Sequence, residues 1–498
     1  MGALIPRANY AALYHCTYLN QAALGLVPTQ AVDAMVAFLR DVAQHGNLRL
    51  SDDQEARILD DLRVAAAEFL DAPEISIAIT AGASEALGQV AAALGSLDGS
   101  VVLVSSDFPS VTYPWLAERE RLGTPIAWVD DRPETDLTEE LVRAIDESTK
   151  AVCFSAVQFG TGSSVHVAAV TARAKDVGCR VIVDATQLAG AGPVSVRHWS
   201  ADAVVCSGYK WLSSHGGVAL LALSPDLLSV TPRLVGWKGT AEPFAFEPTT
   251  LPLAPGARRF EMSTIAYSSA VGLLTSIRLL RTAGAGPIAR HARRLATELI
   301  DRVEPLGWAP FRSLSDPSSC DHIVALRHAL ADVPRVQGAL ATERGIICSS
   351  RGGNLRVSSL QRRERRGRAG RCPRDPHRRL DRLISPHGIV GPGLAGRGPA
   401  LYLWLVPLWC REAQPFRIKL ADPHRRPYPR CPSPGPAVRH ADSGVGLRRG
   451  CCDTRRDGQG WDRRNFQGGR RLQFGSAHLH YVSARRTECV CAAHRSFA

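Results

Sequence analysis

Lysine is scarce in this chain of 498 residues. Lysine and arginine together number 60, yet the lysines are only five, namely Lys150, Lys175, Lys210, Lys238 and Lys419. Most basic positions are therefore arginine, and a lysine kept beside an apolar segment calls for a chemical reason. Lys210 is such a lysine, because it stands among small and aromatic residues in "CSGYKWLSSHGG" (206–217).

Before residue 359 the cysteines are scattered, and we expect neither a signal peptide nor a membrane span. Six of the chain's 13 cysteines precede residue 359, and none of these six forms a C-x-x-C pair. This spacing excludes a disulfide framework and predicts no metal site, so we expect a cytoplasmic protein. The N-terminus has no charged segment followed by an apolar one. The apolar run at 400–410 is too short to span a bilayer.

Acidic residues are rare in the last part of the chain. Residues 1–358 carry 31 Lys+Arg and 37 Asp+Glu (−6), whereas residues 359–498 carry 29 and 10 (+19). This irregular basic tail holds 28 Arg, 13 Pro and seven Cys. We expect it to be disordered or derived from a frameshift. The alternative is a basic arm, but its aromatic residues lack the regular arrangement of a nucleic-acid binder, so we expect no such partner.

Short apolar runs alternate with helical patterns before residue 256. Val- and Ile-rich runs of this kind indicate strands buried on both faces, at 100–106, 151–157, 179–185, 201–207 and 217–223. Helical periodicity lies between several of them. We therefore predict an α/β fold, with a large domain (1–255) built on a mostly parallel sheet flanked by helices.

The pattern changes after residue 255. Two helical patterns follow each other, and then come a strand, a helix and two strands around a Gly-Gly pair. Residues 256–358 therefore predict a smaller α+β domain. The regular pattern stops at Ser358, and we expect this domain to be incomplete.

Lys210 follows one predicted strand, and Asp184 ends another. Ligands bind at the carboxyl ends of strands in such sheets. A desolvated lysine is a usable nucleophile, and a carboxylate at an apolar strand end needs a cation. With Gln187, these residues suit pyridoxal phosphate: Lys210 attaches it, Asp184 binds the ring nitrogen, and Gln187 binds the ring hydroxyl. A surface lysine and a helix-capping aspartate remain the alternatives.

A candidate phosphate site lies earlier in the chain. Ala83 and Ser84 stand directly before a predicted helix, whose free N–H groups and dipole favour an anion. Ser207 and Tyr209, which flank the lysine, offer further hydroxyl donors. Phe108 follows another strand and could stack on a flat ring, or it could pack in the core.

The motifs occur in the order of a known family. The stretches "TYLNQAALGLVP", "TAGASEAL", "DFPSVTYPW", "VDATQLAGAGPVSV", "ADAVVCSGYKWL" and "GNLRVS" carry this likeness, which covers about residues 15–358. The chain resembles fold-type I pyridoxal-phosphate enzymes of the class V aminotransferase superfamily, which includes cysteine desulfurases, kynureninase and isopenicillin N epimerase-like proteins.

The resemblance implies a role for each matching residue. It implies Lys210 as the Schiff-base lysine, and a cofactor site of Ala83, Ser84, Phe108, Asp184, Gln187, Ser207 and Tyr209. It adds Thr264, which would reach the phosphate of a second subunit, and so implies a homodimer. Arg356 would grip the carboxylate of an amino-acid substrate, and Asn20 would lie close by.

Two departures bear on the reaction. Desulfurases carry a nucleophilic cysteine shortly before the arginine, whereas Cys348 lies in an apolar stretch, which argues against a desulfurase. Gln187 replaces a histidine of kynureninase. We therefore expect a transferase of the aminotransferase type. A lyase or an epimerase is the alternative, and an inactive relic is a further one.

Overall fold

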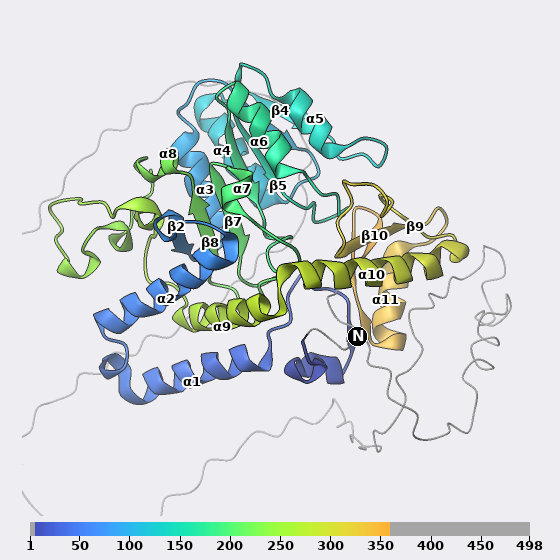
Figure 1. Ribbon diagram of the computed structural model, residues 1–498, viewed down its shortest axis with the longest axis horizontal. Helices are drawn as coiled ribbons and strands as arrows, with labels where there is room; N and C mark the ends of the chain where they lie inside the picture. Colours follow the sequence, from blue (N-terminus) through green and yellow to red (C-terminus); the bar gives the residue numbers. More distant parts are fainter. Residues whose placement is uncertain (1–4, 359–498) are drawn as a thin grey trace, which may run out of the picture. The chain divides into compact units, whose positions relative to one another are not determined.

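The computed structural model describes residues 5–358 (Figure 1). The expectations for residues 359–498, including the frameshift hypothesis and the basic arm, lie outside the described residues. The largest of the three sheets in the described chain has seven strands, which are in spatial order β2 (Ile77–Thr80), β8 (Ala219–Leu223), β7 (Ala203–Ser207), β6 (Arg180–Asp184), β5 (Thr149–Ser155), β3 (Ser100–Val104) and β4 (Ile126–Val129). The five strands from β7 to β4 are parallel, and β8 runs antiparallel to both of its neighbours. The predicted mostly parallel α/β sheet is confirmed.

Helices cover both faces of this sheet. The helices of the described chain are α1 (Thr29–His45), α2 (Asp52–Leu70), α3 (Ala83–Leu94), α4 (Pro109–Leu122), α5 (Leu137–Ala144), α6 (Val167–Asp176), α7 (Val196–Trp199), α8 (Pro225–Leu228), α9 (Tyr267–Ala283), α10 (Ala285–Val303) and α11 (Val333–Arg344). Short 3₁₀ turns lie at Arg7–Asn9, Ala11–Tyr14, Gly46–Leu48, Glu74–Ser76, Trp237–Gly239, Pro243–Ala245, Gly256–Phe260 and Glu304–Leu306.

Alternate residues of each strand enter two different cores. In β5, Val152 and Phe154 pack with α2, α5, α6 and α9, whereas Ala151 and Cys153 pack with α3 and α4. This two-residue period follows from the pleat of a strand, and burial on both faces explains the continuous apolar runs of the sequence. The helices α1, α2 and α9 lie together below the sheet in Figure 1.

The second sheet belongs to the smaller part of the chain. It has four antiparallel strands in the order β12 (Ser349–Arg351), β13 (Asn354–Ser358), β10 (Ile323–Arg327) and β9 (Ala309–Pro310). A separate parallel pair joins β1 (Thr17–Tyr18) to β11 (Ile346–Ile347). The N-terminal segment thus pairs with a strand more than 300 residues later, which no local pattern predicts.

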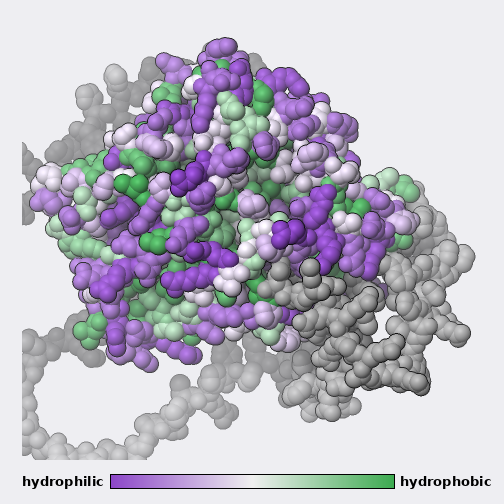
Figure 2. All heavy atoms as spheres, in the orientation of Figure 1, coloured by the Kyte–Doolittle hydropathy of each residue, from purple (hydrophilic) through white to green (hydrophobic). Residues whose placement is uncertain are grey.

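Helix α10 connects the core of the large sheet to the core of the small sheet. Its Ile288 packs in the core of the large sheet, and its Ala296 packs in the core of the small one. Its other side carries exposed residues such as Arg294 and Glu298, and Figure 2 shows this side as hydrophilic. The predicted boundary between residues 255 and 256 stays a prediction, although α9, which follows it, packs in the large core.

Candidate active site

Lys210 lies three residues beyond the carboxyl end of β7. Its side chain is buried, with 6% of the residue exposed. Among residues 5–358, no hydrogen bond or ion pair holds its Nζ. The Nζ atom lies 5.0 Å from the centre of the Phe108 ring and 5.9 Å from that of Tyr209. Lys210 is therefore a buried amine between two aromatic rings, without a counter-ion in contact.

The environment of Lys210 favours its neutral form. Burial lowers the pKa of Lys210 to about 8, and the charges of Arg356 and Arg351 act in the same direction. Asp184 and Asp107 oppose this shift. A lysine with such a pKa carries a substantial fraction of free amine near neutral pH, as a nucleophile or a general base requires.

Asp184 is the last residue of β6 and lies beside the lysine's strand. Burial raises the pKa of Asp184, opposed by hydrogen bonds from Thr186 and by the charge of Lys210. The Thr186 backbone N–H donates to Oδ1 at 2.9 Å. No ion pair neutralises this buried carboxylate within the described chain. A buried carboxylate without a cation is costly, so the site suits a ligand with a positive N–H.

Gln187 is held on both ends of its side-chain amide. Its Nε2 donates to the Ala22 carbonyl at 3.0 Å, and its Oε1 accepts from Trp211 Nε1 at 2.8 Å. The ring of His322 packs edge-on against Trp211 and bonds to the Gln187 carbonyl at 2.5 Å. One N–H of the amide stays free for a ligand. The role predicted for Gln187 at the ring hydroxyl stays a prediction.

The predicted phosphate residues lie at the start of α3. Gly82 precedes the helix, and a side chain there would meet no atom within 4 Å. The Ser84 hydroxyl lies 2.6 Å from that of Ser110, in the first turn of α4. Helix α3 also packs against β7, the strand that ends at Ser207. These contacts bring Ala83 and Ser84 together with the segment that carries Phe108.

Phe108 is fixed by a residue that the sequence analysis missed. Asp107 is buried and accepts hydrogen bonds from the Phe108 N–H (2.6 Å), the Ser155 N–H (2.7 Å), the Ser155 hydroxyl (2.6 Å) and Gln158 Nε2 (3.0 Å). Pro109 then begins α4, which leaves Phe108 outside the helix. Burial raises the pKa of Asp107 to about 6. The position of Asp107 after β3 was the available signal.

The small sheet contributes Arg356. This residue is 2% exposed, and burial together with Arg351 lowers the pKa of Arg356 to about 10. Its Nη1 donates to the Phe159 carbonyl at 2.6 Å, and its Nε donates to Ser349 Oγ at 3.1 Å. Phe159 packs edge-on against Phe108, with ring centres 5.3 Å apart. Arg356 is thus connected to Phe108, and through it to Lys210.

The N-terminal segment closes this region. Gln21 Nε2 donates to the Lys210 carbonyl at 3.1 Å, and the Gly25 N–H donates to the Tyr209 carbonyl at 2.9 Å. A side chain at residue 25 would lie 1.9 Å from the Lys210 carbonyl oxygen, so only glycine fits. The backbone of Asn20 forms an isolated parallel β-bridge with Ser358. The buried side-chain Oδ1 of Asn20 has no hydrogen-bond partner within the described residues.

Two predicted features lie away from these contacts. Thr264 is exposed, and its side chain lies near that of Tyr267. Cys348 is buried, and burial raises the pKa of its thiol to about 11. All six cysteines of the described chain are free, and residues 5–358 contain no group of three or more potential metal ligands. No helix among them is long and apolar enough to cross a membrane.

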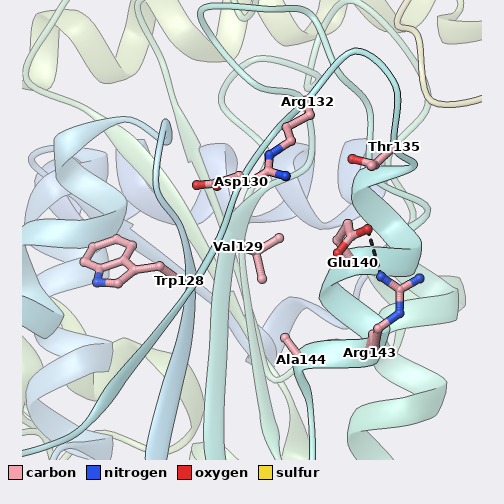
Figure 3. Close-up of a pocket in the computed structure, with 8 residues that line it drawn as sticks. All are labelled: Trp128, Val129, Asp130, Arg132, Thr135, Glu140, Arg143 and Ala144. Atoms are coloured by element: carbon pink, nitrogen blue, oxygen red, sulfur yellow. Dashed lines mark hydrogen bonds and ion pairs between the residues drawn. The ribbon is translucent and has the colours of Figure 1, made fainter.

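A separate pocket of about 280 Å³ lies between β4 and α5 (Figure 3). Glu140 and Arg143 form an ion pair of 2.8 Å at its side. None of the predicted site residues lines it, and three strands separate β4 from β7. The predicted residues around Lys210 therefore remain the candidate active site.

A buried lysine without a partner in the described chain and a buried aspartate, at adjacent ends of parallel strands, are typical of fold-type I pyridoxal-phosphate enzymes. Comparison with known proteins agrees. The family model "Aminotransferase class-V" matches residues 17–366, so the chain belongs to the class V aminotransferase family, whose cofactor is pyridoxal phosphate. The predicted family and cofactor are confirmed.

Several similar proteins are named as cysteine desulfurases, whereas one of Bacillus subtilis, 26% identical over 48% of this chain and 64% of its own length, is named as an uncharacterized aminotransferase. A probable cysteine desulfurase of Streptomyces coelicolor is 28% identical over 66% of this chain and 81% of its own length. Probable cysteine desulfurase 2 of Mycobacterium leprae is 30% identical over 58% of this chain and 71% of its own. In fold, the chain is similar to a solved C-DES mutant with glycine covalently linked to its PLP cofactor, with a TM-score of 0.65, 22% identity, and coverage of 71% and 94%. These names differ in the reaction that they denote, so the expected transferase activity stays a prediction.

Proposed function

We propose that this protein is a pyridoxal-phosphate enzyme that acts on the α-amino group of an amino acid. The observation that carries the proposal is Lys210, a buried amine without a hydrogen-bond partner in the described chain. A fold does not leave a buried ammonium unpaired without cost, so the geometry of Lys210 suits covalent attachment of a ligand.

The surrounding residues fit this cofactor. Asp184 would bind the ring nitrogen, and Phe108 would stack on the ring. The start of α3, with Ser84, would hold the phosphate together with Ser207. When bound, pyridoxal phosphate withdraws electrons from the Cα of an attached amino acid. The protein's part is to keep Asp184 buried, so that its carboxylate favours a protonated partner.

Lys210 is also the proposed base at the substrate Cα. Its pKa of about 8 lets it accept and return a proton near neutral pH. Arg356 would bind the substrate carboxylate, because its Nη2 has no partner among the described residues while its Nε and Nη1 are fixed.

We favour cleavage of a C–S bond as the reaction. The desulfurase names of the relatives support it. Cys348 is too deeply buried, with too high a thiol pKa, to take up sulfur as a persulfide. The sulfur would therefore leave as a free product. Transamination, the reaction expected from the sequence, is the second candidate and requires the same Lys210 and Asp184.

Visible absorption tests the cofactor assignment. The full chain, incubated with pyridoxal phosphate and dialysed, is expected to keep a visible absorption band. Borohydride should reduce the imine, bleach this band and leave the cofactor covalently bound. Lys210→Ala should lose this band, whereas Lys175→Ala, which removes an exposed lysine of α6, should retain it. A band that persists in Lys210→Ala, or a wild-type chain that takes up no cofactor, would overturn the proposal and favour the inactive relic.

Product analysis separates the two reactions. With cysteine or an S-substituted cysteine, elimination at the C–S bond and hydrolysis yield sulfide or a thiol, pyruvate and ammonia without an added oxo acid. Transamination instead requires an oxo acid and leaves the C–S bond intact. Formation of a new amino acid from added oxo acid, without sulfur release, would contradict C–S cleavage.

A homodimer is part of the proposal. Thr264 is exposed, as a residue that serves a second subunit would be. Sedimentation of the full chain should give a dimer, and Thr264→Ala should weaken cofactor binding without changing the position of the absorption band. A monomer with full cofactor affinity would exclude this role.

A further inference from the structure

The hairpin of β12 and β13 carries a second arginine on the same face as Arg356. In its register, Ser349 pairs with Arg356, and Arg351 pairs with Asn354. Directly paired residues, and residues two apart on one strand, share a face of an antiparallel sheet. Ser349, Arg351, Asn354 and Arg356 therefore share one face, and the bond from Arg356 to Ser349 Oγ confirms this.

The turn of the hairpin fixes this arrangement. Gly352 and Gly353 have φ values of 54° and 80°, which side-chain-bearing residues rarely adopt. A two-residue turn of this kind sets Arg351 opposite Asn354 and leaves no slack in the register. The position of Arg351 relative to Arg356 therefore follows from the backbone.

The face with the two arginines is the face that meets the site. Arg356 on this face bonds to the Phe159 carbonyl, Phe159 packs on Phe108, and the Phe108 ring lies 5.0 Å from Lys210 Nζ. The charge of Arg351 acts on both Arg356 and Lys210. Arg351 therefore belongs to the electrostatic surroundings of the reactive amine, although it lies at the exposed end of the hairpin.

No carboxylate of the described chain neutralises either arginine. Neither Arg351 nor Arg356 takes part in an ion pair within residues 5–358, and Arg351 donates only to the Ser350 carbonyl, at 2.7 Å. Asp107, the carboxylate nearest to Phe108 in sequence, already accepts four hydrogen bonds. Two like charges on one face, without a counter-ion, favour binding of more than one negative group.

An amino acid supplies one carboxylate, which Arg356 would bind. We infer that Arg351 is a specificity residue that binds a second negative group, so that the substrate is an amino acid with an anionic side chain. This inference rests on the proposed function and narrows its substrate class. Arg351 binds through an exposed side chain and therefore selects among substrates rather than taking part in the bond-breaking step.

A matched pair of amino acids tests this inference. S-carboxymethylcysteine and S-carbamoylmethylcysteine have the same size and the same C–S bond, and differ in the negative charge at the end of the side chain. Titration of the cofactor-loaded full chain, followed by visible absorption, should give at least tenfold tighter binding of the charged compound.

Variants of Arg351 show whether this residue causes the preference for the charged compound. Arg351→Gln should bring the affinity ratio of the two compounds close to one, and Arg351→Lys should keep part of it. Arg335→Gln, which removes another exposed arginine of the same small domain, should retain the tenfold ratio. An equal affinity of the wild-type chain for both compounds, or a preference that survives in Arg351→Gln, would overturn the inference.

Calorimetry of the cofactor-free chain separates the two proposals. A preference for the charged compound that depends on Arg351, in a chain that takes up no cofactor, would overturn the proposed function and retain only the part of the inference by which Arg351 binds an anionic side chain. A cofactor band with amino-acid binding but without a charge preference would retain the proposed function and overturn the inference.

Discussion

Lys150 and Lys210 are both buried in the large sheet, with 7% and 6% of each residue exposed, but their surroundings differ. Lys150 lies at the amino end of β5, where its Nζ donates to the Gly95 carbonyl (3.0 Å), the Leu97 carbonyl (2.7 Å) and Thr124 Oγ1 (3.2 Å). Lys210 lies beyond the carboxyl end of β7, and its Nζ has no such partner in the described chain.

The difference separates a lysine with a structural role from the lysine that we propose as the reactive one. Gly95 and Leu97 follow the end of α3, where helix carbonyls lack partners, so Lys150 stabilises a chain turn at the amino ends of the strands. At the carboxyl ends the loops diverge and leave space for a ligand. The two lysines are equally buried, but only Lys150 stabilises the fold through hydrogen bonds. Hydrogen-bond partners, rather than burial, therefore distinguish the two lysines.

The largest effect is expected from replacing each lysine by methionine. Lys210→Met should lower activity by about 10²–10⁴-fold, because it removes both the proposed attachment point of the cofactor and the proposed general base. It should leave the free energy of unfolding unchanged or higher, since a buried, unpaired amine is lost. Lys150→Met should retain the cofactor band but lose about 2–4 kcal/mol of stability, because three oxygens lose their donor.

Urea unfolding and visible absorption of the two variants provide the measurement. A loss of stability in Lys210→Met equal to that in Lys150→Met would show that Lys210 is a structural residue and remove the contrast.

Low pH is expected to destabilise the fold through His322, which packs beside the candidate site. Burial lowers the pKa of His322 to about 4 from 6.5. Between these pH values the unfolded chain binds more protons than the folded one, so stability falls as the pH drops. The loss is on the order of 3 kcal/mol. Comparison of urea midpoints at pH 7 and pH 4.5 should show a smaller loss for His322→Phe.

His166→Gln, which replaces an exposed histidine, serves as the control. Asp107 contributes with the opposite sign, because its folded pKa is raised, so the difference between variants isolates His322. The same acid loss in wild type and His322→Phe would contradict the assignment.

Asp107→Asn should have a smaller effect on the same side of the sheet. An amide can replace part of the carboxylate's acceptor capacity, but it brings N–H groups toward the Ser155 and Phe108 donors. We expect a loss of about 1–3 kcal/mol at pH 7.5 and weaker cofactor binding, because Phe108 is no longer fixed. Unchanged stability and cofactor affinity would show that Asp107 does not position Phe108.

The smallest effect is the pH dependence of cofactor attachment. Only the neutral amine of Lys210 reacts, so the rate for the cofactor-free chain should fall about tenfold per pH unit below pH 8. Absorption after rapid mixing, from pH 6 to 9.5, measures it. Arg356→Gln should move the midpoint upward, since it removes a positive charge that lowers the pKa of Lys210. A midpoint near 10.5 in wild type would contradict the surroundings described for this lysine.

Much of the large sheet could be predicted from the sequence. Its apolar runs gave strands because both faces are covered, and Lys210 and Asp184 could be placed at strand ends by counting. Asp107 also follows a strand but was missed, because its role depends on Ser155 and Gln158, which lie about 50 residues later in the chain. Arg351 was missed because its significance depends on the register of a hairpin.

The sequence by itself determined the class of fold and the family, and it singled out the lysine that we propose as the reactive one, since these depend on local periodicity and on motifs of a few residues. Only the tertiary structure decided that Lys150 is saturated and Lys210 is free, that Cys348 is buried, and that Arg351 shares a face with Arg356. These properties depend on atoms from segments far apart in the chain, whose distances no local pattern encodes.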